Sequence, residues 1–105
     1  MATLYISEYS NMAIAASGMG PAFVGAQAPQ EPVITEQTVT SWPAASNPFN
    51  AKTQFVRIHT DSICSIAFGT APTAVATNRR MAAGQTEYYA VPRGGAYKLA
   101  VITNT

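Results

Sequence analysis

Apolar and polar residues alternate along much of this chain, and turn residues interrupt the alternation every few positions. The alternation begins at residues 3–9, TLYISEY, and residues 33–41 are rich in β-branched side chains. After residue 53, turn residues recur at positions 60–61, 69–72, 83–84 and 93–95. Short segments of this kind, separated by turns, are typical of sandwiches and barrels. We therefore predict an all-β fold, a small sandwich or jelly-roll-like barrel of about eight short strands with an extended N-terminal loop region.

The predicted strands cover residues 3–9, 22–28, 33–41, 53–59, 63–68, 73–77, 86–91 and 97–102. The tight turn at 60–62 predicts that the strands on either side of it form a hairpin. Because successive side chains of a strand point to opposite faces, the pattern also predicts which of them lie together. The expected groups are Leu4, Ile6 and Glu8; Val56 and Ile58, inward, with Phe55, Arg57 and His59 opposite; and Tyr97, Leu99 and Val101.

The chain has 105 residues, which fits one β domain, residues 1–105. Within it, residues 10–32 are rich in Ala, Gly and Pro and predict a loop-rich segment. Long loops in small domains are usually functional or disordered, and the apolar side chains of this one favour packing against a partner. We expect an interface built from the N-terminal strand, this segment and two turns. Its expected residues are Leu4, Tyr5, Ile6, Tyr9, Met12, Ile14, Met19, Phe23, Trp42, Arg79 and Arg80.

Charged residues make up only 10% of the chain, against about 25% in a typical soluble domain. Such a surface is poorly protected against association and indicates a subunit of an assembly. The net charge is +1, which argues against a nucleic-acid partner, and the basic pair Arg79-Arg80 is expected in a solvated loop. The apolar stretch 12–25 is interrupted by Gly and Pro and is too short to cross a membrane, so no membrane partner is expected.

The residue types needed for common catalytic and metal sites are scarce. A single cysteine excludes an intrachain disulfide, and Cys64 is expected to be a small buried hydrophobe. With His59 as the only histidine, a zinc site lacks ligands, and the glycine motifs that bind phosphates or dinucleotides are absent. The five acidic residues show no catalytic pairing and are expected at the surface or in turns. We therefore predict no catalytic residues, no cofactor, no metal and no enzymatic activity.

The second half of the chain contains, in this order, the motifs Arg57-Ile58-His59-Thr60-Asp61, Phe68-Gly69, Pro72-Thr73-Ala74, Arg80-Met81-Ala82-Ala83-Gly84, Glu87-Tyr88-Tyr89-Ala90-Val91 and Lys98-Leu99-Ala100-Val101-Ile102. Together with the opening TLYISEY, this pattern resembles small structural proteins encoded beside capsid genes in tailed bacteriophages. The resemblance implies a capsid decoration or cement protein that binds and stabilises the phage head. It would be made in the host bacterial cytoplasm and located on the capsid surface of the virion. The implied partners are the major capsid protein and further copies of the chain, as a homotrimer or another symmetric oligomer.

Two alternatives stay open on the sequence alone. The chain could be a carbohydrate- or receptor-binding β module of a tail or fibre, or a head–tail connector component that forms a ring. The carbohydrate alternative would use Trp42, Tyr88, Tyr89 and Tyr97 as stacking surfaces. It requires at least two of these aromatic side chains to line one open groove beside polar residues, whereas Trp42 is otherwise expected to be a partly buried anchor.

Overall fold

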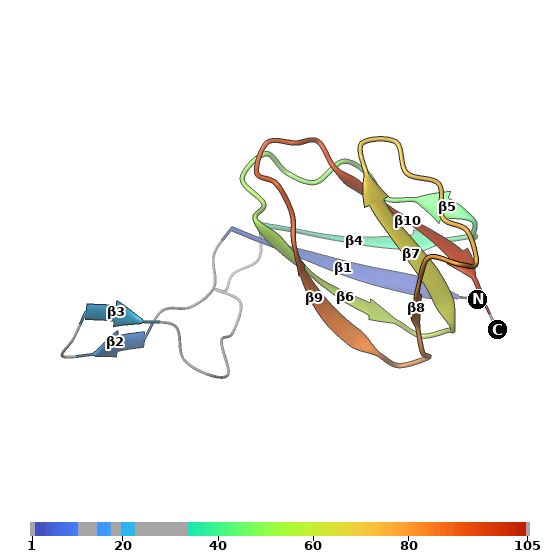
Figure 1. Cartoon of the computed structure of the whole chain (residues 1–105), viewed down its shortest axis with the longest axis horizontal. Helices are drawn as coiled ribbons and strands as arrows, with labels where there is room; N and C mark the ends of the chain where they lie inside the picture. Colours follow the sequence, from blue (N-terminus) through green and yellow to red (C-terminus); the bar gives the residue numbers. More distant parts are fainter. Residues whose placement is uncertain (1, 11–14, 18–19, 23–33, 105) are drawn as a thin grey trace.

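Two antiparallel four-stranded sheets pack together as a β-sandwich, which confirms the predicted all-β class (Figure 1). The computed structural model describes residues 2–10, 15–17, 20–22 and 34–104. The strands of the first sheet are β1 (Thr3–Tyr9), β4 (Thr35–Thr40), β6 (Phe55–Thr60) and β9 (Thr86–Ala90). Those of the second are β5 (Ala44–Ala45), β7 (Cys64–Gly69), β8 (Arg79–Met81) and β10 (Lys98–Thr103). The hairpin of β2 (Ala15–Ser17) and β3 (Gly20–Ala22) is a separate two-stranded sheet.

The strand order is β4-β1-β6-β9 in the first sheet and β5-β10-β7-β8 in the second. The opening strand β1 therefore lies inside its sheet, antiparallel to both neighbours. Its side chains alternate as predicted, because Leu4 and Ile6 are buried while Tyr5 is 45% exposed. The predicted inward positions of β6 are also confirmed, with Val56 and Ile58 fully buried. On β10, Leu99 and Val101 are fully buried, and Tyr97, expected on the same face, packs against the core.

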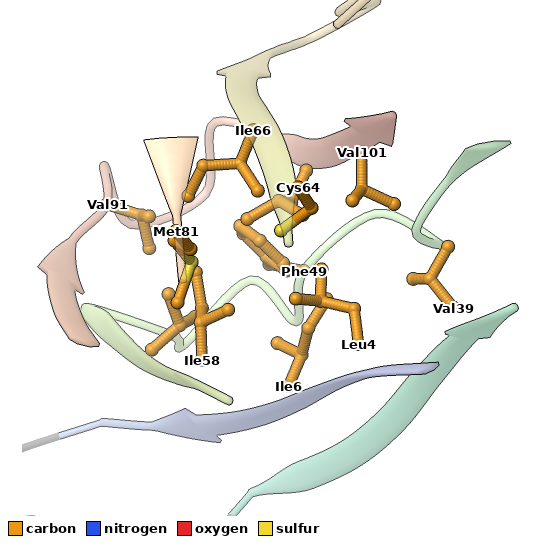
Figure 2. Packing of buried hydrophobic residues seen from close by; sticks show 12 residues of the cluster. Leu4, Ile6, Val39, Phe49, Ile58, Cys64, Ile66, Met81, Val91 and Val101 are labelled. Carbon is orange, nitrogen blue, oxygen red and sulfur yellow. The ribbon is translucent and has the colours of Figure 1, made fainter. Parts of the chain in front are cut away.

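The core lies between the two layers. Its buried residues are Leu4, Ile6, Val39, Phe49, Val56, Ile58, Cys64, Ile66, Met81, Val91, Leu99 and Val101. In Figure 2, side chains from both sheets point toward one another, and Phe49 lies between the layers. Burying one aliphatic side chain of this size contributes about 1.5–3 kcal/mol, so the alternating strands supply the main driving force for folding. Cys64 is 0% exposed, and its predicted role as a small buried hydrophobe is confirmed.

The predicted hairpin of residues 53–59 and 63–68 is wrong. β6 pairs with β1 and β9, whereas β7 pairs with β10 and β8, so the chain crosses from one sheet to the other between them. Hydrogen bonds from Thr60 hold the turn at this crossing. Its hydroxyl donates to the Ser62 carbonyl (2.6 Å) and accepts from the Ser62 N–H (3.2 Å). The alternation of side chains is the same on both sides of a hairpin turn and of such a crossing, and it does not distinguish them.

The stretch around residues 73–84 also differs from the expectation. Residues 73–77 form no strand, and the adjacent arginines lie in the edge strand β8 instead of a loop. Asn78 closes a turn before β8, since its side-chain oxygen accepts from the Val75 N–H at 2.7 Å. Met81 then anchors β8 in the core with no exposed surface. The strand predicted at 22–28 overlaps β3 only at Ala22, because residues 23–33 lie outside the described part of the chain.

Glu8 is buried, with 1% of its surface exposed. The expectation that it lies at the surface or in a turn is wrong. One carboxylate oxygen accepts from the Asn50 N–H (2.7 Å) and the Thr53 hydroxyl (2.8 Å), and the other from the Gln37 side-chain amide (3.1 Å). Gln37 in turn accepts from the Asn47 N–H at 3.0 Å. A buried carboxylate is tolerated only when its oxygens are satisfied in this way. Glu8 therefore ties the connection between β5 and β6 to the first sheet.

We expect the substitution Glu8→Gln to lower the free energy of unfolding by about 1–3 kcal/mol, the cost of leaving a buried polar group without its partner. The amide nitrogen that replaces one carboxylate oxygen faces a donor and has nothing to accept its hydrogens. The measurement is urea-induced unfolding at a single low protein concentration. Glu36→Gln is the matched control, because Glu36 is exposed and should change stability by less than about 0.5 kcal/mol. Equal stability of the two variants would contradict the role given to Glu8.

Candidate interaction surface

The outer side of the first sheet carries two complete rows of side chains, one residue from each strand. The pairing register aligns Thr38, Tyr5, His59 and Thr86 in one row, and Glu36, Ser7, Arg57 and Tyr88 in the next. We call these eight residues the outer face. Because they alternate with the core positions of the same strands, they point away from the second sheet.

An open, shallow hollow of about 480 Å³ lies on the outer face. It is lined by Tyr5, Ile6, Ser7, Glu36, Gln37, Thr38, Arg57 and His59. Ser7 is the smallest of these residues and lies on the central strand, between the longer side chains of β4 and β6. The hollow therefore follows β1, and charged and aromatic groups form its rim.

Two exposed aromatic side chains lie on the outer face. Tyr5 and Tyr88 are 45% and 51% exposed, and Val75 is the other large hydrophobic residue of comparable exposure in the described part of the chain. The rings of Tyr5 and His59 lie 6.1 Å apart between centroids. His59 is held from its other side, since its Nδ1 lies 2.7 Å from the Thr86 hydroxyl oxygen. These contacts orient two rings on a rigid sheet.

Two opposite charges flank Ser7. Glu36 lies beside it on β4 and Arg57 on β6, each directly opposite in the register. Neighbouring strands are about 4.8 Å apart, so the two backbone positions are separated by roughly 10 Å. Within the described residues, neither side chain makes a hydrogen bond or an ion pair, although Arg57 is half-buried. The outer face thus carries a carboxylate and a guanidinium that are both available to a partner.

The expected interface residues divide between the core and the surface. Leu4 and Ile6 are 0% and 1% exposed and fill the core of the chain itself, so their assignment to an interface is wrong. Tyr9 is also buried and stacks on Phe55 with centroids 5.3 Å apart. Trp42 is half-buried against the core, as expected of an anchor, and its indole N–H donates to the Val39 carbonyl at 2.9 Å.

The other expected residues lie at the surface or beyond the described ranges. Tyr5 belongs to the outer face, while Arg79 and Arg80 are exposed on the edge strand β8. The Arg79 guanidinium lies over the Tyr89 ring, 4.8 Å from its centroid, which is a cation–π geometry. The predictions for Met12, Ile14, Met19 and Phe23 lie outside the described residues.

Sequence reasoning did not assign Glu36, Arg57 or His59 to an interface. The alternation of β6 already placed Arg57 and His59 together on its outward side. It did not identify β1 and β4 as the adjoining strands, because those strands lie within the first 40 residues, far from β6 along the chain. The missing step was the strand order.

The residues considered for catalysis do not assemble. Asp61 accepts from the Thr3 N–H (2.8 Å), which lowers the pKa of its carboxyl, and from the Ser62 hydroxyl (3.1 Å). Among the described residues it makes no bond to His59. Cys64 faces the core, whereas His59 lies on the outer face. In the same part of the chain, no group of three or more His, Cys, Asp or Glu residues is placed to hold a metal ion.

Comparisons of the chain with protein-family models, with curated proteins and with solved structures find no match. Within the described ranges, no helix has the length and hydrophobicity of a membrane span. The function is therefore inferred from the outer face, the composition and the motifs.

Burial predicts the reactivity of the one thiol. It raises the pKa of Cys64, so less thiolate is present at a given pH than for an exposed cysteine. We expect native protein at pH 8 to react with 5,5′-dithiobis(2-nitrobenzoic acid) only at the rate of unfolding, and to react at once in denaturant. The control is Val75→Cys in a Cys64→Ala background, since Val75 is 48% exposed. A native Cys64 as fast as this control would contradict its burial.

Proposed function

We propose that this chain is a structural protein of a tailed-bacteriophage virion, a capsid decoration or cement protein that acts by protein–protein contacts. The observation that carries the proposal is the outer face, where half-exposed Tyr5 and Tyr88 accompany the uncommitted Arg57 on an open sheet. Tyr and Arg are enriched in protein interfaces and dominate their binding energy. The motif resemblance supplies the virion as the context.

The composition supports the same role. With 10% charged residues, the chain has few groups whose charge must be desolvated on binding, and uncharged groups are less costly to bury than charged ones. The proposed partners are the major capsid protein and further copies of the chain, as a trimer or another symmetric oligomer on the capsid surface. A shell presents many equivalent sites, so weak individual contacts add up when linked copies bind together. The proposal involves neither catalysis nor a cofactor, and neither nucleic acid nor membrane as a partner.

A carbohydrate-binding tail module is the second candidate, but with different residues from those first expected. Of the expected stacking residues, Trp42, Tyr89 and Tyr97 pack against the core, which leaves Tyr88 as the strongly exposed one. The hollow beside Tyr5 favours this candidate instead, since it sets an aromatic ring next to hydroxyl, carboxylate and guanidinium groups. No feature of the described residues favours the connector alternative.

The copy number per particle tests the decoration role. We expect quantitative mass spectrometry of purified virions to find this chain at a number comparable with that of the major capsid protein. A copy number that matches a single ring would instead indicate a connector. Finding the chain only on isolated tails would indicate a tail module. Particles without the protein should release DNA at a lower temperature, because they lack the contacts that brace the shell. Unchanged release would contradict a cementing role.

A binding experiment separates the second candidate from the first. If the hollow takes a sugar, the purified protein binds oligosaccharides of the host envelope in isothermal titration calorimetry, and Tyr5→Ala lowers that affinity about tenfold or more. Val75→Ala is the control, because Val75 is equally exposed and lies away from the outer face. We expect no binding of these sugars by the wild-type protein. Saturable binding that Tyr5→Ala removes would replace the decoration proposal.

A further inference from the structure

We infer that the outer face binds a second copy of this chain, in a two-fold symmetric dimer where Glu36 of each copy pairs with Arg57 of the other. The inference names the partner of the surface on which the proposed function rests. It depends on that surface being a contact face and does not depend on the phage assignment.

The first support is the position of the charges relative to the central strand. Glu36 and Arg57 both lie opposite Ser7, on the two sides of β1. The outer face is therefore negative on the β4 side and positive on the β6 side at the same level along β1. Closed dimers are built from self-complementary patches, in which residue i contacts j and j contacts i. A patch with one charge of each sign, equally far from its midline, meets this condition.

Symmetry then selects one arrangement. Consider a two-fold axis that runs between the outer faces of the two copies, parallel to β1 and over Ser7. This axis places the β4 side of one copy over the β6 side of the other. Each Glu36 then faces an Arg57, and the pairing occurs twice. An axis in the same plane but perpendicular to β1 places Glu36 against Glu36 and Arg57 against Arg57. Like charges set together at an interface cost several kcal/mol, so the charges favour the parallel axis.

The neighbouring row fits the same operation. Tyr5 lies on the midline and meets the Tyr5 of the other copy, which allows an offset aromatic contact. Thr38 meets His59, whose Nε2 is the ring nitrogen not engaged by Thr86. The small Ser7 meets itself where the hollow lies, so the faces can approach closely there. No pair in the two rows sets like charges together.

The packing geometry is an ordinary one for sheets. An axis parallel to β1 keeps the strands of the two copies nearly parallel, and stacked sheets align their strands within about 30°. The area of one sheet face is at the small end of protein interfaces. We therefore expect a dissociation constant in the micromolar range. Tyr88 belongs to β9, two strands from the axis, and its symmetry position lies beyond β4 at the sheet edge. It remains at the rim although it is the more exposed tyrosine.

Charge reversal tests the pairing, with dissociation constants from sedimentation equilibrium. We expect wild-type protein to dimerise, and Glu36→Arg or Arg57→Glu to weaken dimerisation about tenfold or more, as for other close charge pairs. An equimolar mixture of E36R and R57E should recover a heterodimer of near wild-type affinity, because both cross-axis pairs are then oppositely charged. The double variant E36R/R57E should recover a homodimer for the same reason. Circular dichroism confirms that these surface variants fold.

The tyrosines supply an independent check. Tyr5→Ala should weaken the dimer about tenfold, and Tyr88→Ala should have little effect, whereas exposure alone would rank them the other way. A wild-type chain that stays monomeric at millimolar concentration overturns the inference, as does a mixture of E36R and R57E that associates no better than each alone. A dimer with this charge dependence, in a chain missing from virions, would overturn the proposed function alone.

Discussion

The pairing of β1 with β4 on one side and β6 on the other is the constraint on which the rest of the structure depends. Side chains alternate with a period of two, so a slip of one residue would exchange the two faces of the strand. Leu4 and Ile6 would then face solvent, and Tyr5 and Ser7 would enter the core. The same register that closes the core therefore also sets the rows of the outer face. Stability and surface chemistry are two results of one alignment.

The carboxylate of Glu8 reinforces this alignment. It is buried on the inward side of β1 and accepts hydrogen bonds from Gln37, Asn50 and Thr53. Moving β1 by one residue would remove the carboxylate from all three donors, which is more costly than losing a nonpolar contact because a buried charge would lose its partners. The network connects β1 to β4 through Gln37 and to the connection before β6 through the other two. Hydrophobic burial drives the layers together, and this polar cluster makes one register preferable to its neighbours.

The sequence was informative where a property is local and uninformative where it depends on partners. The faces of β1, β6 and β10 follow from alternation, which needs only the residues of each strand. The burial of Glu8 could not be foreseen, because Asn50 and Thr53 lie more than forty residues further along the chain. The crossing between β6 and β7 has the same turn residues as a hairpin. The outer face was missed for a related reason, since placing Glu36 and Arg57 on either side of Ser7 requires the order β4-β1-β6.

Scarcity makes the two charges of the outer face informative. The chain has six Lys or Arg and five Asp or Glu residues. With so few charged residues, two opposite charges seldom fall by chance at equal distances from one strand. Where charges are few, each one contributes a large share of the discrimination between correct and incorrect partners, because the remaining surface associates without strong preference. A cluster of equal sign would keep copies apart, and a surface without charges would allow many orientations. One pair across the central strand permits association and restricts it to one orientation. The strands that form the sandwich thus also carry the residues of the proposed contact surface.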